Sequence, residues 1–560
     1  MNRPLLALLA LLSSPGWADT LVTNVNGVQA GSDGQLQHFT GLIVADDGKV
    51  RTVLTGPPPP IQFTDSIDGH GRTLLPGLID AHGHVIDSPG GDMGLGLTML
   101  QLDLSGTSSI ADLQRRLAAY AQANPGSGWI LGRGWNQELW PDKRFPTASD
   151  LDAAVADRPV LLARVDGHAA VANSAGLRAA DITSAASDPQ GGRIERDDAG
   201  KPTGLFIDNA IALVAGKIAP PTSDAMDRGL EKAEDFLLSN GITTVADMGT
   251  SKASWEAMQR RGTNGRLRIR FIAYADGSQP MAVDKPTGWL FSDRLRMAGV
   301  KLYADGALGS RGAFLKQPYA DKPDTRGLSF LSDAQLREQA ESAASRGFQL
   351  AVHAIGDAAN AQVITVYEAL SKTYGTDRRW RIEHFQIVDP ADIPRLAPAG
   401  IIASMQPTHQ TSDRLMAEKR LGRDRLAGAY AWQSVLRSGA RIAFGSDFPV
   451  ESPNPFPGLA AAVSRQDMNG QPPGGWLPAE RVSFARALSG FTRDAAYAGF
   501  AEDKIGALEP GKWADFILVD RDVSTVDPQA LARTQVLETW VAGKKVWERA
   551  PTAVQPERGK

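Results

Sequence analysis

The sequence of 560 residues contains no cysteine, and its formal net charge at pH 7 is only −4. The absence of cysteine excludes disulfides, thiolate metal ligands and cysteine nucleophiles, so any bound metal must use nitrogen and oxygen ligands. The charge lacks the basic excess that is typical of nucleic-acid binding, so a nucleic acid is not an expected partner. Beyond the N-terminus no apolar run is long enough to span a membrane, which predicts no stable membrane anchor.

The first 18 residues have the composition of a secretory signal peptide. A single Arg3 precedes the apolar residues 4–12, and small residues follow up to Ala18. This order matches a charged region, a hydrophobic region and a cleavage site, with cleavage expected after Ala18. A buried N-terminal helix is the alternative. We therefore predict an exported protein that begins near Asp19 and is periplasmic or secreted.

Both ends of the remaining chain show short β-type runs separated by turns. They comprise residues 21–25, 41–44 and 49–54 near the N-terminus, and residues 510–520 and 536–547 near the C-terminus. This shared pattern predicts one small composite β domain, formed by residues 19–73 together with residues 500–560.

Between these ends, eight short apolar runs alternate with amphipathic helical segments. The runs are residues 74–79, 242–246, 269–274, 300–304, 349–353, 379–384, 401–406 and 441–446. Alternating β and α elements predict a parallel sheet, and eight repeats predict an α/β fold of the (β/α)8 TIM-barrel type over residues 74–499. The stretch of about 100–240, after the first strand, is too long for one crossover. It predicts an insertion with apolar runs of its own at 129–131 and 160–163.

Histidine is scarce, yet it gathers at one level of the predicted barrel. Five of the eight histidines fall at or just beyond the carboxyl ends of predicted strands, namely His82, His84, His353, His384 and His409. Asp447 follows the eighth strand in the same way. Because active sites of (β/α)8 barrels lie at this face, the distribution predicts an active site there.

His82 and His84 end the first apolar run as a His-x-His pair. Alternate residues of a strand point to the same face, so the two imidazoles project side by side. Two neutral imidazoles placed in this way suit a divalent metal such as Zn²⁺. For an isolated pair of this kind, two polar residues in a surface loop would be the preferred interpretation, but the other histidines at this level favour the metal site.

Lys301 lies within the apolar run of the fourth predicted strand. An unpaired ammonium in such surroundings would be costly. Lys301 is therefore either a buried, ion-paired lysine or a lysine carbamylated by CO₂, whose two oxygens could bridge two metals. The residues leave both alternatives open, and Asp305 is the competing carboxylate of this segment.

Taken together, these residues resemble the amidohydrolase superfamily. More closely, the chain is similar to the YtcJ-like branch, amidohydrolase family 3, whose relatives include N-substituted formamide deformylases. The resemblance covers nearly the whole chain after the signal and rests on residues 75–84, 134–137, 165–169, 304–311, 352–357, 382–384, 405–409, 445–449 and 506–515. These motifs are specific for the superfamily and the branch, but they say little about the substrate.

The resemblance implies hydrolysis of a small-molecule substrate by metal-activated water, with one or two divalent metals per chain and Zn²⁺ as the expected ion. The implied ligands are His82, His84 and Asp447 for one metal, and His353 and His384 for the other. A carbamylated Lys301 would bridge the two, and an unmodified Lys301 would favour a mononuclear site. Asp447 is the expected general base.

Five further residues are candidates for substrate contacts: His409, His168, Asp166, Trp135 and Arg311. His409 follows the seventh strand at the level of the barrel mouth. His168 and Asp166 lie in the insertion, either in a loop over the mouth or in a hydrogen-bonded turn. Trp135 would line an apolar pocket or fill a local core, and Arg311 would bind a substrate carboxylate or form an internal salt bridge.

The leading hypothesis is an exported metal-dependent hydrolase of a C–N bond other than a peptide bond, in an N-formyl or N-acyl amide. The same site could instead act on an ester, a lactone or a carbamate, because the fold alone does not decide the chemistry. A catalytically silent binding protein is a third alternative. It would be expected to have lost a ligand residue, and none is missing. The sequence leaves open whether the chain forms a homo-oligomer.

Overall fold

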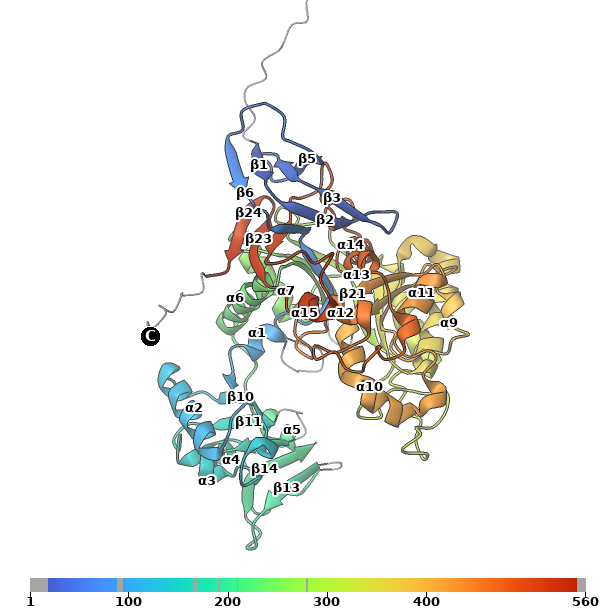
Figure 1. The fold of residues 1–560 in the computed structure, drawn as a ribbon. Helices are drawn as coiled ribbons and strands as arrows, with labels where there is room; N and C mark the ends of the chain where they lie inside the picture. Colours follow the sequence, from blue (N-terminus) through green and yellow to red (C-terminus); the bar gives the residue numbers. More distant parts are fainter. Residues whose placement is uncertain are drawn as a thin grey trace, which may run out of the picture. The chain divides into compact units, whose positions relative to one another are not determined.

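The computed structural model describes residues 19–87, 94–164, 169–189, 192–208, 210–277 and 281–550 (Figure 1). The chain forms two compact units, one of Met1–Gly94 with Ala233–Lys560 and the other of Leu95–Lys232. The predicted signal peptide, residues 1–18, lies outside the described residues. Among the helices that are described, none is long and apolar enough to cross a membrane.

The larger unit contains one sheet of eight parallel strands. In sheet order they are β8 (Leu78–Gly83), β15 (Ile242–Thr250), β16 (Arg270–Asp276), β17 (Leu295–Tyr303), β18 (Gln349–Ala354), β19 (Arg381–His384), β20 (Ile402–Met405) and β21 (Arg441–Phe444). The segment after β21 meets β8, because the Asp447 N–H donates to the His82 carbonyl (2.7 Å) and the His84 N–H donates to the Phe448 carbonyl (2.9 Å). The sheet is therefore a nearly closed barrel, and the predicted fold class is confirmed.

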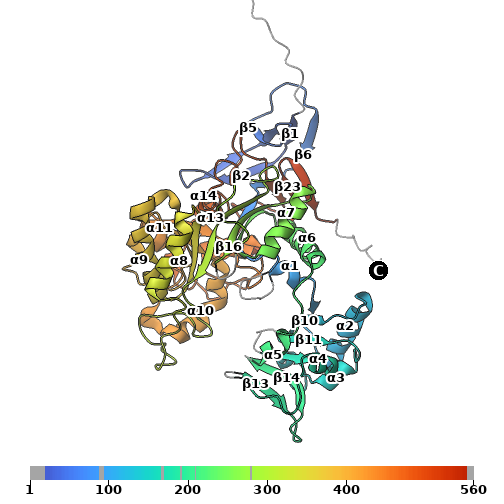
Figure 2. The same cartoon turned by 180° about the vertical axis from the view of Figure 1, so that it is seen from behind.

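Helices cover the outside of this barrel. They are α7 (Lys252–Thr263), α8 (Asp333–Ser345), α9 (Asp357–Tyr374), α10 (Pro407–Leu421), α11 (Trp432–Arg437), α12 (Pro455–Ser464), α13 (Phe484–Gly490) and α14 (Arg493–Ala498). Figure 2 shows α8, α9, α10 and α11 gathered along one side of the barrel. Local signals set their ends: α8, for example, begins with a capping box of Ser332 and Gln335.

Strands from both ends of the chain share a second sheet in the larger unit. Its order is β24 (Lys544–Glu548), β23 (Val536–Val541), β22 (Phe516–Val519), β7 (Thr73–Pro76), β2 (Asn26–Ala30) and β3 (Leu36–Phe39). Beside it lies a four-stranded sheet of β5 (Val50–Leu54), β4 (Gly41–Val44), β1 (Thr20–Thr23) and β6 (Asp65–Asp68). The two sheets enclose a core that includes Leu42, Leu74, Phe516 and Trp540.

The apolar run 74–79 forms two strands and not the single barrel strand that was predicted. Residues up to Pro76 belong to β7, which pairs with β22, whereas β8 of the barrel begins at Leu78. Between them the Gly77 N–H donates to the Asp515 carbonyl (2.8 Å). A Cβ atom added at Gly77 would stand only 2.3 Å from the Thr243 side chain, so the chain changes sheets at a residue that must be small.

The smaller unit has its own six-stranded sheet. The order is β13 (Gly192–Arg196), β14 (Pro202–Asp208), β12 (Ala169–Ala172), β11 (Val160–Arg164), β10 (Ile130–Trp135) and β9 (Leu102–Asp103). Its helices are α1 (Leu95–Thr98), α2 (Ile110–Ala123), α3 (Ala148–Asp152), α4 (Ser174–Ala179) and α5 (Ile211–Ala215), and α6 (Ser223–Ser239) leads on to β15. The apolar runs at 129–131 and 160–163 correspond to β10 and β11.

Candidate active site

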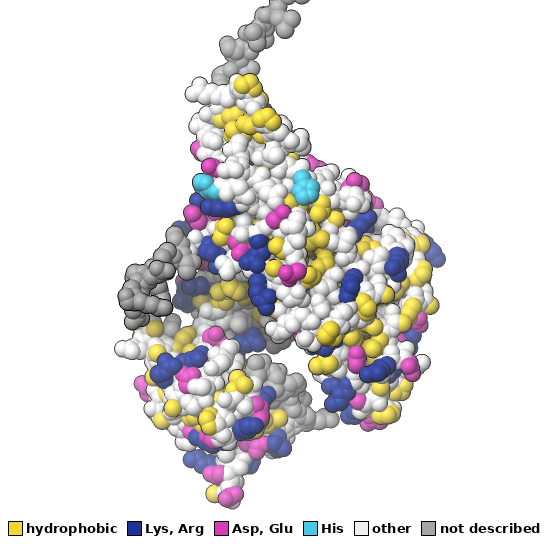
Figure 3. All heavy atoms as spheres, in the orientation of Figure 1, with side chains coloured by type: hydrophobic (Ala, Val, Ile, Leu, Met, Phe, Trp, Pro, Cys, Tyr) yellow, Lys and Arg dark blue, Asp and Glu magenta, His cyan; other side chains and the backbone are white. Residues whose placement is uncertain are grey.

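The carboxyl ends of the barrel strands bring the predicted ligand residues together. His82 lies in β8 and His84 directly after it, and Lys301, His353 and His384 lie in β17, β18 and β19. Asp447 follows β21, and His409 lies in the first turn of α10. In contrast, His38 and His70 are exposed, and on the face in Figure 3 histidine side chains appear only over the N-terminal β strands.

Asp447 is the centre of this cluster. Its Oδ1 lies 3.3 Å from His82 Nε2 and 3.2 Å from His84 Nε2, and its Oδ2 lies 3.7 Å from His409 Nε2. Its backbone has a φ of 61°, in the left-handed region that non-glycine residues seldom adopt, and His384 has a φ of 75°. Strained backbone of this kind persists where the surrounding structure fixes it, and it is common at active sites.

The remaining imidazoles pack beside this centre. The ring centroid of His384 lies 4.7 Å from that of His82 and 4.4 Å from that of His353. Three buried ring nitrogens have no hydrogen-bond partner among the described residues: His84 Nδ1, His353 Nε2 and His409 Nε2. Buried nitrogens without partners are costly unless a ligand satisfies them. The set of imidazoles and a carboxylate matches the donors that divalent zinc binds, so these residues fit a metal.

Burial keeps these imidazoles neutral, the state in which histidine binds a metal. Burial, with the nearby Lys301 as a second cause, lowers the pKa of His82 to about 4 and that of His353 to about 3. The pKa of His384 also lies well below its usual range, again mainly because of burial. For Asp447, burial alone would raise the pKa, but the imidazoles of His82 and His84 outweigh it and hold the carboxyl pKa well below its ordinary value.

Glu383, which was not among the predicted site residues, fixes the orientation of His82. Its Oε2 lies 2.7 Å from His82 Nδ1, and Arg381 donates to both of its oxygens (2.7 and 3.1 Å). Burial would raise the pKa of Glu383, but Arg381 outweighs it and holds that pKa well below its usual range. A carboxylate that accepts from Nδ1 directs the other ring nitrogen of His82 into the site. In the sequence, Glu383 directly precedes His384, and this position is the signal that could have identified it as a site residue.

Gln406 has the same relation to His384, because its Oε1 lies 3.0 Å from His384 Nδ1. Asp80 ties β8 to the segment after β21 by accepting hydrogen bonds from His82 N (3.0 Å), Ser446 N (3.1 Å) and Ser446 Oγ (2.6 Å). Burial raises the pKa of Asp80 to about 7. Gln406 and Asp80 hold the predicted ligand residues in position.

Lys301 is buried, and its Nζ lies 3.3 Å from His82 Nε2. No salt bridge joins it to a carboxylate among the described residues, and the charges of Glu383 and Asp447 act on it from a greater distance. Burial lowers the pKa of its ammonium to about 8. Asp305, the competing carboxylate of this segment, accepts hydrogen bonds from the N–H groups of Phe314 (2.8 Å), Ile355 (2.9 Å) and Gly356 (2.8 Å). Asp305 therefore organises the loop beside the site.

The other predicted substrate contacts lie elsewhere or outside the described residues. Trp135 is fully buried in the core of the smaller unit, where its Nε1 donates to the Leu162 carbonyl (2.8 Å), so it fills a core and does not line a pocket. Arg311 forms an ion pair with Asp321 (2.9 Å), the internal salt bridge that the sequence left open. Asp166 and His168 fall in residues 165–168, which the structure does not describe.

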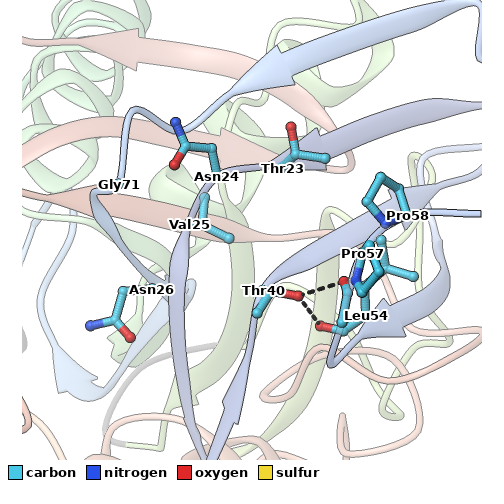
Figure 4. A pocket seen from close by; sticks show the side chains of 10 residues that line it. Thr23, Asn24, Val25, Asn26, Thr40, Leu54, Pro57, Pro58 and Gly71 are labelled. Atoms are coloured by element: carbon cyan, nitrogen blue, oxygen red, sulfur yellow. Dashed lines mark hydrogen bonds between the residues drawn. The ribbon is translucent and has the colours of Figure 1, made fainter.

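A surface cavity of about 590 Å³ lies away from this cluster, in the N-terminal β region (Figure 4). Residues 23–26, Thr40, Leu54 and the turn 56–58 line it, and Thr40 Oγ1 donates to the Leu54 and Gly56 carbonyls (3.1 and 2.8 Å). None of the residues that line it carries an ionisable side chain, so the cavity offers no catalytic group.

The barrel and its cluster of imidazoles and carboxylates have the features of a metal-dependent hydrolase. The chain belongs to the amidohydrolase family, whose model matches residues 65–547. The predicted resemblance is confirmed.

Known proteins resemble nearly the whole chain. It is 35% identical to LONG AFTER FAR-RED 3 of Arabidopsis thaliana (86% of this chain, 84% of that protein). It is 32% identical to YtcJ of Bacillus subtilis, over 87% of this chain and 91% of that protein. It is 27% identical to N-substituted formamide deformylase of Arthrobacter pascens, over 86% of this chain and 90% of that protein. A solved structure of an uncharacterized metal-dependent hydrolase from Pyrococcus horikoshii is 27% identical, with a TM-score of 0.74, and the match covers 91% of this chain and 99% of that one.

Proposed function

We propose that the protein is an exported, metal-dependent hydrolase that cleaves an amide-type C–N bond other than a peptide bond, in an N-formyl or N-acyl amine. The convergence of buried, neutral imidazoles on Asp447 at the barrel mouth carries the proposal. The similarity to N-substituted formamide deformylase favours a C–N bond over an ester, a lactone or a carbamate.

In this proposal the site binds two Zn²⁺ ions. His82, His84 and Asp447 would hold one ion and His353 and His384 the other, and a carbamylated Lys301 would supply oxygen ligands. Ions bound in such a site lower the pKa of water to roughly 7 and polarise a carbonyl oxygen. His353 Nε2 supports this assignment, since it is buried without a hydrogen bond to any described residue. The nearest carboxylate oxygen with which it forms an ion pair, Asp305 Oδ1, lies 3.6 Å away.

Asp447 acts as the general base and then as the general acid. It takes a proton from water as the water oxygen adds to the carbonyl carbon, and the π electron pair of the C=O bond moves onto the carbonyl oxygen. When the C–N bond breaks, that pair re-forms the carbonyl and Asp447 gives its proton to the leaving nitrogen. One water is consumed, and a carboxylic acid and an amine are released. His409, 3.7 Å from Asp447 Oδ2, lies where it can contact the substrate.

The Lys301 carbamate requires CO₂ as its only reagent. The neutral amine adds to the carbon of CO₂, one N–H proton leaves, and a carbamate anion results. Two observations support this choice: Lys301 forms no salt bridge with a carboxylate among the described residues, and burial lowers its pKa to about 8, which makes the neutral amine accessible.

Metal analysis tests the site. Protein purified without chelator and with bicarbonate present should contain about two metal atoms per chain. The Lys301→Ala variant should contain fewer, whereas Lys217→Ala, an exposed lysine paired with Asp181, should match the wild type. With ¹³C-labelled bicarbonate, a carbamate signal should appear in the wild type and not in Lys301→Ala. One metal per chain in all three proteins would contradict the bridged pair, and no metal after reconstitution would contradict a hydrolase of this kind.

A substrate panel tests the bond. The metal-loaded protein is offered N-formyl amines, N-acyl amines, cyclic hydantoin-like amides and esters, and product release is measured. Turnover of an N-formyl or N-acyl amine that exceeds turnover of the matched ester supports the proposal. Turnover of the ester alone would contradict it.

Export is tested separately. Residues 1–18 are proposed to be removed after Ala18, so the protein recovered outside the cytoplasm should begin at Asp19 by N-terminal sequencing. Recovery of the complete chain from the cytoplasm alone would contradict export.

A further inference from the structure

Tyr303 lies inside the active site but has no role in the function proposed above. It is the last residue of β17, two positions after Lys301, so both side chains point to the same face of the strand. Its ring centroid lies 5.3 Å from Lys301 Nζ and 5.9 Å from the ring centroid of His353, the residue opposite it in the β17–β18 pair. Tyr303 therefore borders the ligand cluster on the side of His353.

The phenol oxygen of Tyr303 is buried and has no hydrogen-bond partner among the described residues. The fully buried tyrosines elsewhere each have one: Tyr274 donates to Gln349 (2.6 Å), Tyr319 to the Ala313 carbonyl (2.7 Å), Tyr367 to the Arg381 carbonyl (2.8 Å) and Tyr430 to Asp413 (2.8 Å). A buried hydroxyl without an acceptor is unfavourable, because it has lost its hydrogen bonds with water. A phenylalanine would fill the same space without this cost, so the hydroxyl of Tyr303 indicates a missing acceptor.

We propose that Tyr303 is a catalytic residue whose phenol donates a hydrogen bond to the carbonyl oxygen of the substrate. This inference rests on the proposed function. As water adds to the carbonyl carbon, the π electron pair moves onto this oxygen, and a hydrogen bond to it becomes stronger as negative charge develops. The phenol keeps its proton throughout. The group therefore stabilises the transition state more than the bound substrate, which raises kcat.

The alternative acceptor inside the site is a carbamate oxygen on Lys301, whose Nζ lies 5.3 Å from the Tyr303 ring centroid. In that case Tyr303 would hold the bridge between the metals, and removing the hydroxyl would release metal. Metal content therefore separates a role toward the substrate from a role toward the bridge.

The test compares Tyr303→Phe with the wild type and with Tyr367→Phe, which removes a buried phenol that already has a backbone acceptor. The substrate is the carbonyl compound that the wild type cleaves best in the panel. Tyr303→Phe should lower kcat by about 100-fold with little change in KM, because one donor to the developing oxyanion is lost. Its metal content should equal that of the wild type, and Tyr367→Phe should keep the wild-type kcat.

A kcat of Tyr303→Phe within about threefold of the wild type would overturn the assignment, and so would a fall in kcat that follows a loss of metal. Failure of the Tyr303 proposal and failure of the proposed function give different results. If the wild type cleaves only esters, the C–N bond is wrong, but Tyr303 is still tested on the ester carbonyl. If the metal-loaded wild type cleaves nothing in the panel, both proposals are overturned.

Discussion

Three buried polar groups at the carboxyl ends of the barrel strands differ from a buried ion pair at the amino end of one strand. At the carboxyl ends of the strands, His84 Nδ1, His353 Nε2 and the Tyr303 hydroxyl are buried without hydrogen-bond partners among the described residues. At the amino end of β16, Arg270 donates to both oxygens of Asp515 (2.7 and 2.9 Å) and to the Asp293 carbonyl (2.8 Å). The groups without partners are available to a bound ligand, whereas the charges of Arg270 and Asp515 pair with each other and fasten the barrel to the sheet of β22.

Changing Asp447 to Asn should have the largest effect on the carboxyl end. The variant removes the proposed base and one proposed metal ligand, so kcat should fall by about 1,000-fold or more when measured at saturating substrate. Asp321→Asn, which alters a carboxylate paired with Arg311 outside the cluster, is the control and should keep kcat. A variant of Asp447 that keeps more than a tenth of wild-type kcat would contradict its role.

At the amino end, Arg270→Ala should unfold the protein more easily without changing catalysis. The variant leaves the Asp515 carboxylate buried without its cation, which is expected to lower the free energy of unfolding by about 3–5 kcal/mol. Urea denaturation measures this change, and the exposed Arg337→Ala should stay within about 0.5 kcal/mol of the wild type. The folded variant should retain wild-type kcat. A fall in kcat at unchanged stability would mean that the two ends are not separate.

A smaller effect is expected from Gln406→Met, which keeps the volume but removes the acceptor from His384 Nδ1. The imidazole is then less well oriented, and metal affinity should fall by about 10-fold. Competition with a chromogenic chelator measures the affinity. Gln433→Met, the same change on α11, serves as the control. Equal affinities for the two variants would show that Gln406 does not position His384.

The pH at which the site is assembled should report on Lys301. Burial lowers the pKa of this amine from 10.5 to about 8, and only the neutral amine adds to CO₂. Activation of metal-free protein by zinc and bicarbonate should therefore accelerate as the pH rises, with a midpoint near pH 8. Activity regained over time at each pH gives the rate. A midpoint near 10.5, or a rate that bicarbonate does not change, would argue against the carbamate.

The barrel could be predicted from the sequence because each strand is a short apolar run that is buried in the fold. The same property caused the error at 74–79: residues on both sides of Gly77 are buried, so the run shows no sign of the change of sheets. The histidines revealed the site because they are rare and follow strands. The role of Tyr303 could not be predicted, since a tyrosine in an apolar strand is typical of a core. Its position in the site becomes visible only from its register with Lys301 and His353.

The roles of Trp135 and Arg311 could not be decided from the sequence either. A large aromatic residue can pack in a core or line a pocket. An arginine can form an ion pair with a carboxylate of the protein or of a ligand. The deciding partners, the Leu162 carbonyl for Trp135 and Asp321 for Arg311, become neighbours only after folding.

The pairing of β7 with β22 also sets the order in which the molecule can fold. β7 precedes the first strand of the barrel, while β22 is among the last elements of the chain. During synthesis β7 leaves the ribosome long before its partner exists, and its unpaired edge, with Leu74 and Leu75, is open to pairing with other chains. A chain truncated before Phe516 would consequently not be a smaller enzyme. It is expected to aggregate, because β7, which directly precedes the first barrel strand, would lack its partner β22.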